Sequence, residues 1–216
     1  MMEMTELSKV MRDGGVVGAG GAGFPSYAKL NKDADTIILN CAECEPLLKL
    51  HRQVLEKHAQ EITFALDTIA KAVEADRVII AIKPGYKEAI AAVNKCISNY
   101  KNMSVGLLPE IYPAGDEVIT IYETTGRIVP PGSIPISVGV TVFNVETALN
   151  VARMLNENKP VTYKYITIAG EVKHPVTLKA PLGITYGELI ELAGGGRCYK
   201  DFKRGTCNAR TSVYSG

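Results

Sequence analysis

The residues with the clearest chemical potential are four glycines that stand within six positions near the start of the chain. They are Gly18, Gly20, Gly21 and Gly23. Because glycine lacks a Cβ, a flat or anionic ligand can approach the main-chain amides of such a loop. Pro25 suits the first turn of a helix, whose positive end would then face that ligand. The alternative is an ordinary tight connection between a strand and a helix.

Two acidic turns further along the chain could supply hydrogen-bond acceptors. The first contains Glu43 and Glu45, and the second contains Asp116 and Glu117. Carboxylates in these turns would accept hydrogen bonds from ribose hydroxyls or from a nicotinamide amide. The alternative for the second turn is a capping role at the start of a helix expected over residues 118–125.

A polar segment, residues 144–147, follows an apolar run over residues 138–143 that is typical of a buried strand. The helical pattern that continues after Thr147 places this segment at the start of a helix. Main-chain amides at such a position, together with the Thr147 hydroxyl, suit a phosphate group. A plain N-cap is the alternative.

In their order and separations, these motifs resemble those of one flavoprotein family. It is the FMN- and NADH-binding domain shared by the flavoprotein subunit of respiratory complex I and by the RnfC subunit of ion-pumping ferredoxin:NAD oxidoreductases. The loop and its Ala-Glu-Cys-Glu-Pro turn are most similar to the RnfC branch, which includes PduS-type cobalamin reductases and the electron-transfer protein associated with proline reductase. The resemblance covers about residues 10–196. It also rests on Tyr112-Pro113-Ala114-Gly115-Asp116-Glu117, Val129-Pro130-Pro131-Gly132 and Phe143-Asn144-Val145-Glu146-Thr147.

The resemblance implies which residues surround the cofactors. The residues expected around the flavin ring are the four glycines, Lys29 and Asn40, with Glu43 and Cys44 beside them. Those expected next to the flavin and nicotinamide are Gly115, Asp116 and Glu117. The FMN phosphate is expected near Asn144, Val145 and Thr147, and NADH near Phe24 and Tyr112. Lys29 could instead be a solvated helix residue.

Two departures from the complex I pattern weaken the expectation of NADH binding more than that of flavin binding. Ala19 stands where that pattern has an arginine, and Ala42 where it has an aspartate. These changes leave room for a non-catalytic alternative. In that alternative the chain is a nucleotide- or cobalamin-associated binding module, or a scaffold subunit of a larger redox complex.

The function that the resemblance implies is electron transfer by a noncovalently held FMN, which accepts hydride from NADH and passes electrons to a downstream acceptor. The cofactor supplies the chemistry, so no side chain need act as an acid or a base. The cysteine-rich motifs that hold iron–sulfur clusters in the full family are absent from this sequence. We therefore expect partner subunits or domains that carry such clusters.

The cysteines and histidines do not form a convincing metal site. Cys41 and Cys44 have a spacing seen in zinc sites, but no second pair or neighbouring histidines complete four ligands. The family resemblance makes Cys44 part of a pocket wall, and Cys41 is expected to be a packed thiol. The histidines expected at surface or packing positions are His51, His58 and His174.

The amino-acid composition limits the classes of partner and the cellular location that we expect for the chain. The chain has 216 residues, 46% of them hydrophobic and 22% charged, with a formal net charge of +1. This balance gives no reason to expect nucleic acid or an anionic membrane as a partner. Without an apolar run long enough to span a bilayer or a signal-like start, the sequence predicts a cytoplasmic protein that would meet a membrane only through partners.

Alternating strand and helix patterns predict an α/β fold with a mostly parallel sheet covered by helices, similar to a Rossmann fold. The expected helices are residues 5–12, 55–73, 86–99 and 185–193, and the expected strands of the sheet are 35–40, 77–82, 103–108 and 138–143. In such sheets, ligands bind beyond the carboxyl ends of the strands.

The chain divides into three predicted parts. The family resemblance implies that residues 1–158 form the FMN- and NADH-binding domain and that residues 159–196 form an incomplete β-grasp segment of the SLBB kind. The sequence pattern of this segment predicts extended stretches at 163–169, 170–175 and 176–180. Residues 197–216 are an atypical or truncated tail. This tail has few large apolar residues to offset its ordering entropy, so we expect an extended or partly ordered path.

Overall fold

The structure is a computed structural model that describes residues 2–20, 23–43, 45, 48–196 and 211–215. Two candidate site residues, Gly21 and Cys44, lie outside the described residues, as does most of the predicted tail.

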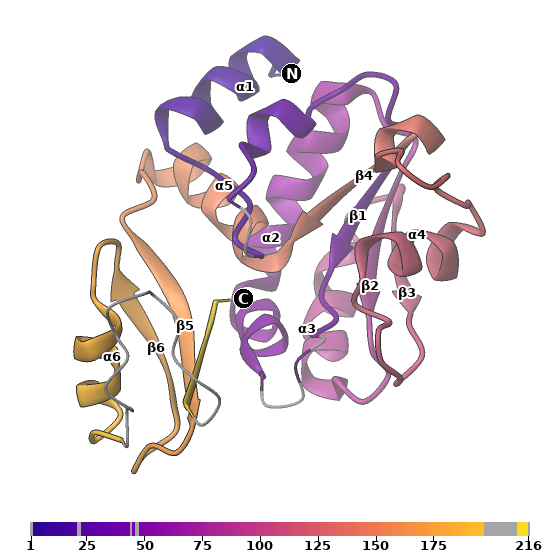
Figure 1. The fold of residues 1–216 in the computed structure, drawn as a ribbon. Coiled ribbons are helices and arrows are strands. Elements are labelled where there is room, and N and C mark those ends of the chain that lie inside the picture. The colour runs from indigo at the N-terminus through magenta and orange to yellow at the C-terminus, as the bar shows by residue number, and fades with distance from the viewer. Residues whose placement is uncertain (1, 21–22, 44, 46–47, 197–210, 216) are drawn as a thin grey trace.

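Four parallel strands form the central sheet, as the sequence predicted (Figure 1). Their order is β3-β2-β1-β4, and their bounds are β1 Thr36–Asn40, β2 Arg77–Ile82, β3 Met103–Leu107 and β4 Val140–Asn144. The chain runs from β1 outward to β3 and then crosses back to place β4 on the other side of β1. The strand order therefore reverses between β1 and β4, which is where open α/β sheets bind ligands.

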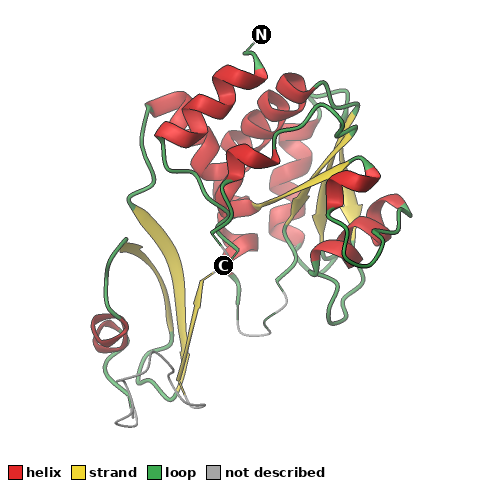
Figure 2. Cartoon of the chain, turned by 45° about the horizontal axis from the view of Figure 1, so that its top comes forward, coloured by secondary structure: helices red, strands yellow, loops and turns green. Residues whose placement is uncertain are grey.

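Helices cover both faces of this sheet (Figure 2). The helices packed on one face are α1 Met4–Asp13, α2 Leu50–Val73, α3 Lys87–Ile97 and α5 Val145–Glu157. Helix α4, Glu117–Thr125, packs on the other face through Ile121. Side chains alternate between the two cores along each strand, so Ile37 and Leu39 belong to the first and Ile38 to the second. Burial of both faces explains the continuous apolar runs that predicted these strands.

A second, antiparallel sheet follows, with β5 Tyr163–Gly170 between β6 Val176–Pro181 and β7 Thr211–Ser215. Helix α6, Tyr186–Leu192, packs on it through Leu189 and Ala193. The stretch predicted to be extended over residues 170–175 is instead a connection with a single bridge from Val172 to Gly196. The extended path predicted for the tail is seen for residues 211–215, which form β7.

Three local predictions about the first domain were inaccurate. The segment after Pro25 is one turn of 3-10 helix, Ser26–Lys29, so it lacks the dipole of a full helix. A second 3-10 turn, Pro135–Val138, ends at Gly139 with a left-handed φ of 71°, which delays the start of β4. Helix α2 begins at Leu50 rather than at residue 55, with a kink at His58.

Among the described residues, no helix is long and apolar enough to cross a membrane.

The loop that precedes α4 depends on one buried hydroxyl. Thr120 is fully buried, and its Oγ1 donates to the carbonyl of Ala114 at 3.0 Å. Replacing it in Thr120→Val keeps the shape but leaves that buried carbonyl without this donor, so we expect a loss of about 1–3 kcal/mol in the free energy of unfolding. Urea unfolding measures this loss.

Thr124→Val is the matched control, because within the described part of the chain the Thr124 hydroxyl bonds only to carbonyls of its own helix, the nearer being that of Thr120 at 2.7 Å. Its expected effect is within about 0.5 kcal/mol. Equal losses in both variants would contradict a specific role for the bond to Ala114.

Candidate functional site

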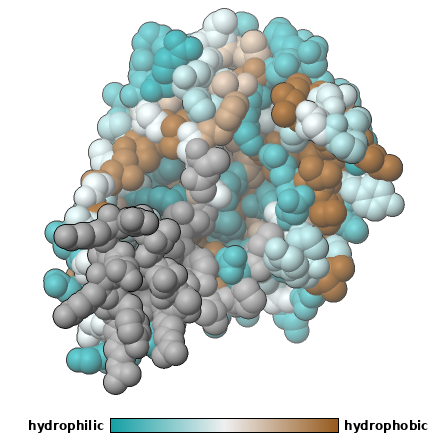
Figure 3. Space-filling model, in the orientation of Figure 1, coloured by the Kyte–Doolittle hydropathy of each residue, from teal (hydrophilic) through white to brown (hydrophobic). Residues whose placement is uncertain are grey.

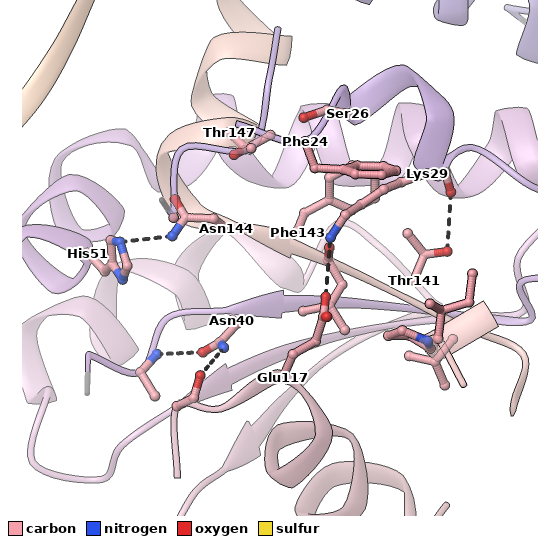
Figure 4. Close-up of a pocket in the computed structure, with 18 of the residues that line it drawn as sticks. Phe24, Ser26, Lys29, Asn40, His51, Glu117, Thr141, Phe143, Asn144 and Thr147 are labelled. Carbon is pink, nitrogen blue, oxygen red and sulfur yellow. Dashed lines mark hydrogen bonds and ion pairs between the residues drawn. The ribbon is translucent and has the colours of Figure 1, made fainter. Parts of the chain in front are cut away.

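A cavity of about 870 Å³ lies beyond the carboxyl ends of β1 and β4. Its walls come from the glycine-rich loop, the strand ends, residues 134–136 and the starts of α4 and α5, with Ala42, Glu43, Glu45, Leu48 and His51 (Figure 4). The sequence-predicted candidates that line it are Gly18, Gly20, Gly23, Phe24, Lys29, Asn40, Glu43, Gly115, Glu117, Asn144 and Thr147. Segments that are far apart in the sequence thus meet in one cavity.

Hydrogen bonds shape the glycine-rich loop. The amide of Gly18 donates to the carbonyl of Phe24 at 2.7 Å, which closes the loop, and the amide of Ala19 donates to Thr147 Oγ1 at 2.9 Å. Gly23 has a φ of 64°, a left-handed conformation that favours glycine. A Cβ added to Gly20 would have Asn144 Nδ2 as its nearest neighbour, at 3.5 Å. Gly23 therefore serves the shape of the loop, whereas Gly20 keeps the cavity open.

Asn40 connects the end of β1 to two of the cavity walls. Its Nδ2 donates to the carbonyl of Gly115 at 2.8 Å, and its Oδ1 accepts from the amide of Ala42 at 3.0 Å. In the parallel pairing of β1 with β4, Asn40 stands directly opposite Asn144. The two asparagines therefore mark the floor of the cavity, where the strand order reverses.

Asn144 joins β4 to α5 and to His51. Its Oδ1 accepts from the amide of Glu146 at 2.9 Å and caps α5, and its Nδ2 lies 2.9 Å from His51 Nε2 (Figure 4). Because the Asn144 oxygen is taken by the cap, the side-chain amide nitrogen faces the ring and donates to Nε2. His51 therefore carries its ring proton on Nδ1 when neutral.

His51 lies in the cavity wall with an unsatisfied ring nitrogen. Its side chain is buried, as one of the two sequence alternatives for it allowed, and Nδ1 has no hydrogen-bond partner among the described residues. Burial, and after it the charge of Lys164, lower the pKa of His51 to about 4. His51 was not predicted as a site residue, because the three histidines lie apart in the sequence and each was expected at a surface or packing position.

Glu43 is a buried carboxyl group in the same wall. Its Oε1 accepts from the amide of His51 at 2.9 Å, while Oε2 has no hydrogen-bond partner among the described residues and lies 3.9 Å from Arg52 Nε. Burial raises the pKa of Glu43, and the amide of His51 and the charge of Arg52 oppose that rise. Glu43 thus keeps one oxygen available for a ligand.

Lys29 and Glu117 face each other across the other end of the cavity (Figure 4). Lys29 Nζ lies 3.2 Å from Glu117 Oε1 and donates to the carbonyl of Val142 at 2.9 Å. The same ammonium group lies 6.0 Å from the centre of the half-exposed Phe24 ring. Lys29 is therefore held in the cavity wall rather than extended into solvent, which was its alternative.

Three described candidates do not line the cavity. Asp116 caps α4 by accepting from the amides of Val118 and Ile119 at 3.0 and 3.3 Å, which was the alternative for that turn. Tyr112 is 79% exposed, so the aromatic wall expected there is absent from the cavity lining, and Val145 is fully buried. Asp116 thus caps a helix, Tyr112 is exposed to solvent and Val145 packs in the core.

Cys41 is a packed thiol, as expected. It is fully buried in the core, and burial raises its pKa well above the ordinary value. Among the described residues, no group of three metal-ligating side chains comes together.

Residues 11–153 match the family model described as the Nuo51 FMN-binding domain, and residues 165–201 match the SLBB domain. Cobalamin reductase PduS of Citrobacter freundii is 44% identical over 185 residues, which cover 86% of this chain and 41% of that protein. The RnfC-type subunit of the Na⁺-translocating ferredoxin:NAD⁺ oxidoreductase complex of Acetobacterium woodii is 33% identical over 199 residues, which cover 90% and 45%. The chain thus spans less than half the length of these relatives.

A solved structure shares the fold. The NAD⁺-reducing [NiFe]-hydrogenase in the H₂-reduced state matches with a TM-score of 0.72 at 22% identity, over 90% of this chain and 39% of that one. At this identity the likeness concerns the fold alone.

The buried His51 makes stability depend on pH. Its pKa is about 4 in the folded protein and 6.5 in the unfolded chain, so only the unfolded state gains a proton as the pH falls from 6.5 to 4. We expect the wild type to lose about 3 kcal/mol of unfolding free energy in this window relative to His51→Gln, which does not titrate.

Urea unfolding of both proteins at pH 7 and pH 4 measures the difference, and the carboxyl groups common to both cancel. The glutamine side chain can still accept from Asn144. Parallel pH profiles in the two proteins would show that His51 is not held in its neutral form.

Proposed function

Because this chain belongs to the family of the Nuo51 FMN-binding domain, we propose that its cavity binds FMN noncovalently and that it acts as an electron-transfer flavoprotein module. The observation that carries the proposal is the meeting of the open Gly20, the two strand-end asparagines and the start of α5 in one cavity. Such a site combines close main-chain approach with polar groups at fixed positions.

The residues present fit FMN. The cavity volume of about 870 Å³ falls within the range of small-molecule sites. Absence of a side chain at Gly20 leaves room for a planar ring against the loop. His51 Nδ1 and Glu43 Oε2 are buried polar atoms without hydrogen-bond partners among the described residues, and a polar ligand would satisfy them. These features favour a large ligand with both a flat and a polar part.

We place the phosphate of FMN near the start of α5. This helix has 13 residues, so its amino-terminal amides and dipole favour an anion. The amide of Glu146 is already taken by the Asn144 cap, and Thr147 Oγ1 already accepts from Ala19. The hydroxyl proton of Thr147 remains available as a donor. The proposed phosphate contacts are therefore this hydroxyl and the remaining main-chain amides, including that of Val145.

Bound FMN would supply the redox chemistry by accepting hydride from NADH and releasing electrons to a downstream acceptor. The chain's own residues would position the two cofactors and stabilise the charge that develops on the flavin. Lys29 and the amides of the loop would stabilise negative charge near the ring. Glu43 and Glu117 would accept hydrogen bonds from a ribose or a nicotinamide, since both line the cavity. Phe24, half exposed at the wall, would contact the dinucleotide.

We propose that the electrons leave to partner subunits or domains that carry iron–sulfur clusters. Relatives named as subunits of ion-translocating oxidoreductase complexes support such an assembly. We propose that it lies on the cytoplasmic side of a membrane, which this chain meets only through partners. Exposed apolar side chains also gather around α4 (Figure 3). They include Ile111, Val118, Ile128 and Ile134. An apolar area of this kind is typical of a protein contact surface.

A second candidate is a binding module or scaffold that does not oxidise NADH. The position of Tyr112 favours it, because this side chain is exposed and does not line the cavity where an aromatic contact to NADH was expected. Ala42, which lines the cavity where the complex I pattern has an aspartate, also favours it. The two candidates differ in whether NADH reduces the bound flavin.

Gly20→Val tests the cavity. A Cβ at this position makes only an ordinary contact, with Asn144 Nδ2 at 3.5 Å, and the valine methyl groups would occupy the space left for the ring, so we expect FMN affinity to fall by about tenfold or more. Titration followed by flavin fluorescence measures the affinity, and thermal unfolding checks the fold.

Gly187→Val is the control, since the nearest atom to a Cβ at Gly187, in α6, is Thr185 Oγ1 at 3.9 Å and the residue does not line the cavity. It should bind FMN as the wild type does. Unchanged affinity in Gly20→Val would mean that the ring does not lie against the loop.

Anaerobic mixing of the FMN-loaded chain with NADH tests the proposed chemistry. We expect the absorbance of oxidised flavin to bleach, because hydride transfer needs only the two cofactors in contact. Flavin that binds but stays oxidised would favour the scaffold alternative, while failure to bind FMN at all would remove the proposed function.

A further inference from the structure

Lys164 on β5 reaches from the second sheet to the glycine-rich loop. Its ammonium group donates to the carbonyl of Ala19 at 2.5 Å and lies 3.5 Å from Glu146 Oε2. The contact to Ala19 joins residues 145 positions apart in the chain. Figure 1 shows β5 running beside the domain that holds the cavity. Lys164 therefore connects two parts of the fold that have separate sheets.

The peptide groups around Ala19 are held from two sides. Thr147 Oγ1 of α5 accepts from the Ala19 amide at 2.9 Å, and Lys164 of β5 donates to the Ala19 carbonyl. Because a trans peptide is planar, its N–H points opposite to its carbonyl. Orienting the Ala19 carbonyl towards Lys164 therefore turns the amide of Gly20 away from β5. Lys164 thus sets the direction of an amide in a residue that lines the cavity.

Glu146 anchors the ammonium group. It lies in the first turn of α5 and its side chain is 1% exposed, with Oε1 accepting from the amide of Tyr165 at 2.9 Å. Two neighbouring residues of β5 thus contact one buried carboxylate. Burial raises the pKa of Glu146 and the charge of Lys164 opposes the rise. Removing Lys164 alone would leave this buried carboxylate without its cation, at a cost in stability.

The charge of Lys164 also acts inside the cavity. After burial, it is the second cause that lowers the pKa of His51, which lines the cavity wall. A positive charge that disfavours protonation of His51 favours negative charge at the same place. An anionic ligand in the cavity would gain from it.

We propose that Lys164 is a positioning residue for the FMN site, through which the β-grasp segment holds the glycine-rich loop in its binding shape and favours the anionic cofactor. The proposal rests on the proposed function, because FMN is the ligand. It implies that the second sheet is part of the flavin site although Lys164 itself does not line the cavity.

The test compares the wild type with Lys164→Met and with the double variant Lys164→Met/Glu146→Gln. The double variant removes both charges of the buried pair, so it should unfold closer to the wild-type temperature than the single variant does. We expect both variants to bind FMN about tenfold more weakly. The midpoint potential of the bound flavin should fall in Lys164→Met, since reduction adds negative charge, and should fall less in the double variant, which also loses the negative charge of Glu146. Hydrogen exchange of the Ala19 amide should become faster in the FMN-free protein.

Lys179→Met is the matched control. Lys179 lies on β6, opposite Tyr165, and its ammonium group stacks on the Tyr163 ring at 3.4 Å from the centre. The substitution removes a lysine from the same sheet without touching the loop, so the FMN affinity and the midpoint potential of the bound flavin should match those of the wild type.

The outcomes separate the two proposals. A wild type that takes up no FMN overturns the proposed function. A wild type that binds FMN, with a folded double variant of equal affinity and equal Ala19 exchange, overturns the role of Lys164 alone. Equal losses in Lys179→Met would also overturn it, because the effect would then follow from net charge.

Discussion

The pairing of the ends of β1 and β4 is the constraint on which the candidate site depends. Parallel register places Asn40 opposite Asn144, and hydrogen bonds from these side chains fix Gly115, Ala42, His51 and the start of α5. A shift of one residue in either strand would turn its asparagine to the other face and separate those segments. The apolar cores on both faces of the sheet specify the register. The register that packs these cores is therefore also the one that assembles the candidate site.

Buried polar groups give the cavity its chemical character. Glu43 and His51 lie in the same wall. Burial raises the pKa of Glu43 and lowers the pKa of His51, and both shifts favour the neutral form of the side chain. Each also retains one polar atom without a hydrogen-bond partner in the described residues. Unsatisfied buried atoms are costly in a folded protein, and they are most common where a ligand completes them. The wall is therefore better suited to a polar ligand than to an apolar one.

The fold and family were predictable from the sequence because their signals are local. Apolar runs such as residues 36–39 predicted the strands, and the ordered motifs predicted the family resemblance, which the family matches confirm. The missed features depend on distant partners. Burial of His51 depends on Asn144, 93 residues away, and the contact of Lys164 with the loop spans 145 residues. The exposure of Tyr112 has no local signal either, since the same motif permits both orientations.

The glycine-rich loop acquires its shape from outside itself. Gly23 supplies a left-handed turn and Gly20 an open surface, but the peptide groups on either side of Ala19 are oriented by Thr147 on α5 and Lys164 on β5. A loop already held in place loses little conformational freedom when a ligand binds, so more of the contact energy appears as affinity. The contribution of the described loop residues to binding therefore depends on helix α5 and strand β5, which hold Ala19 from two sides.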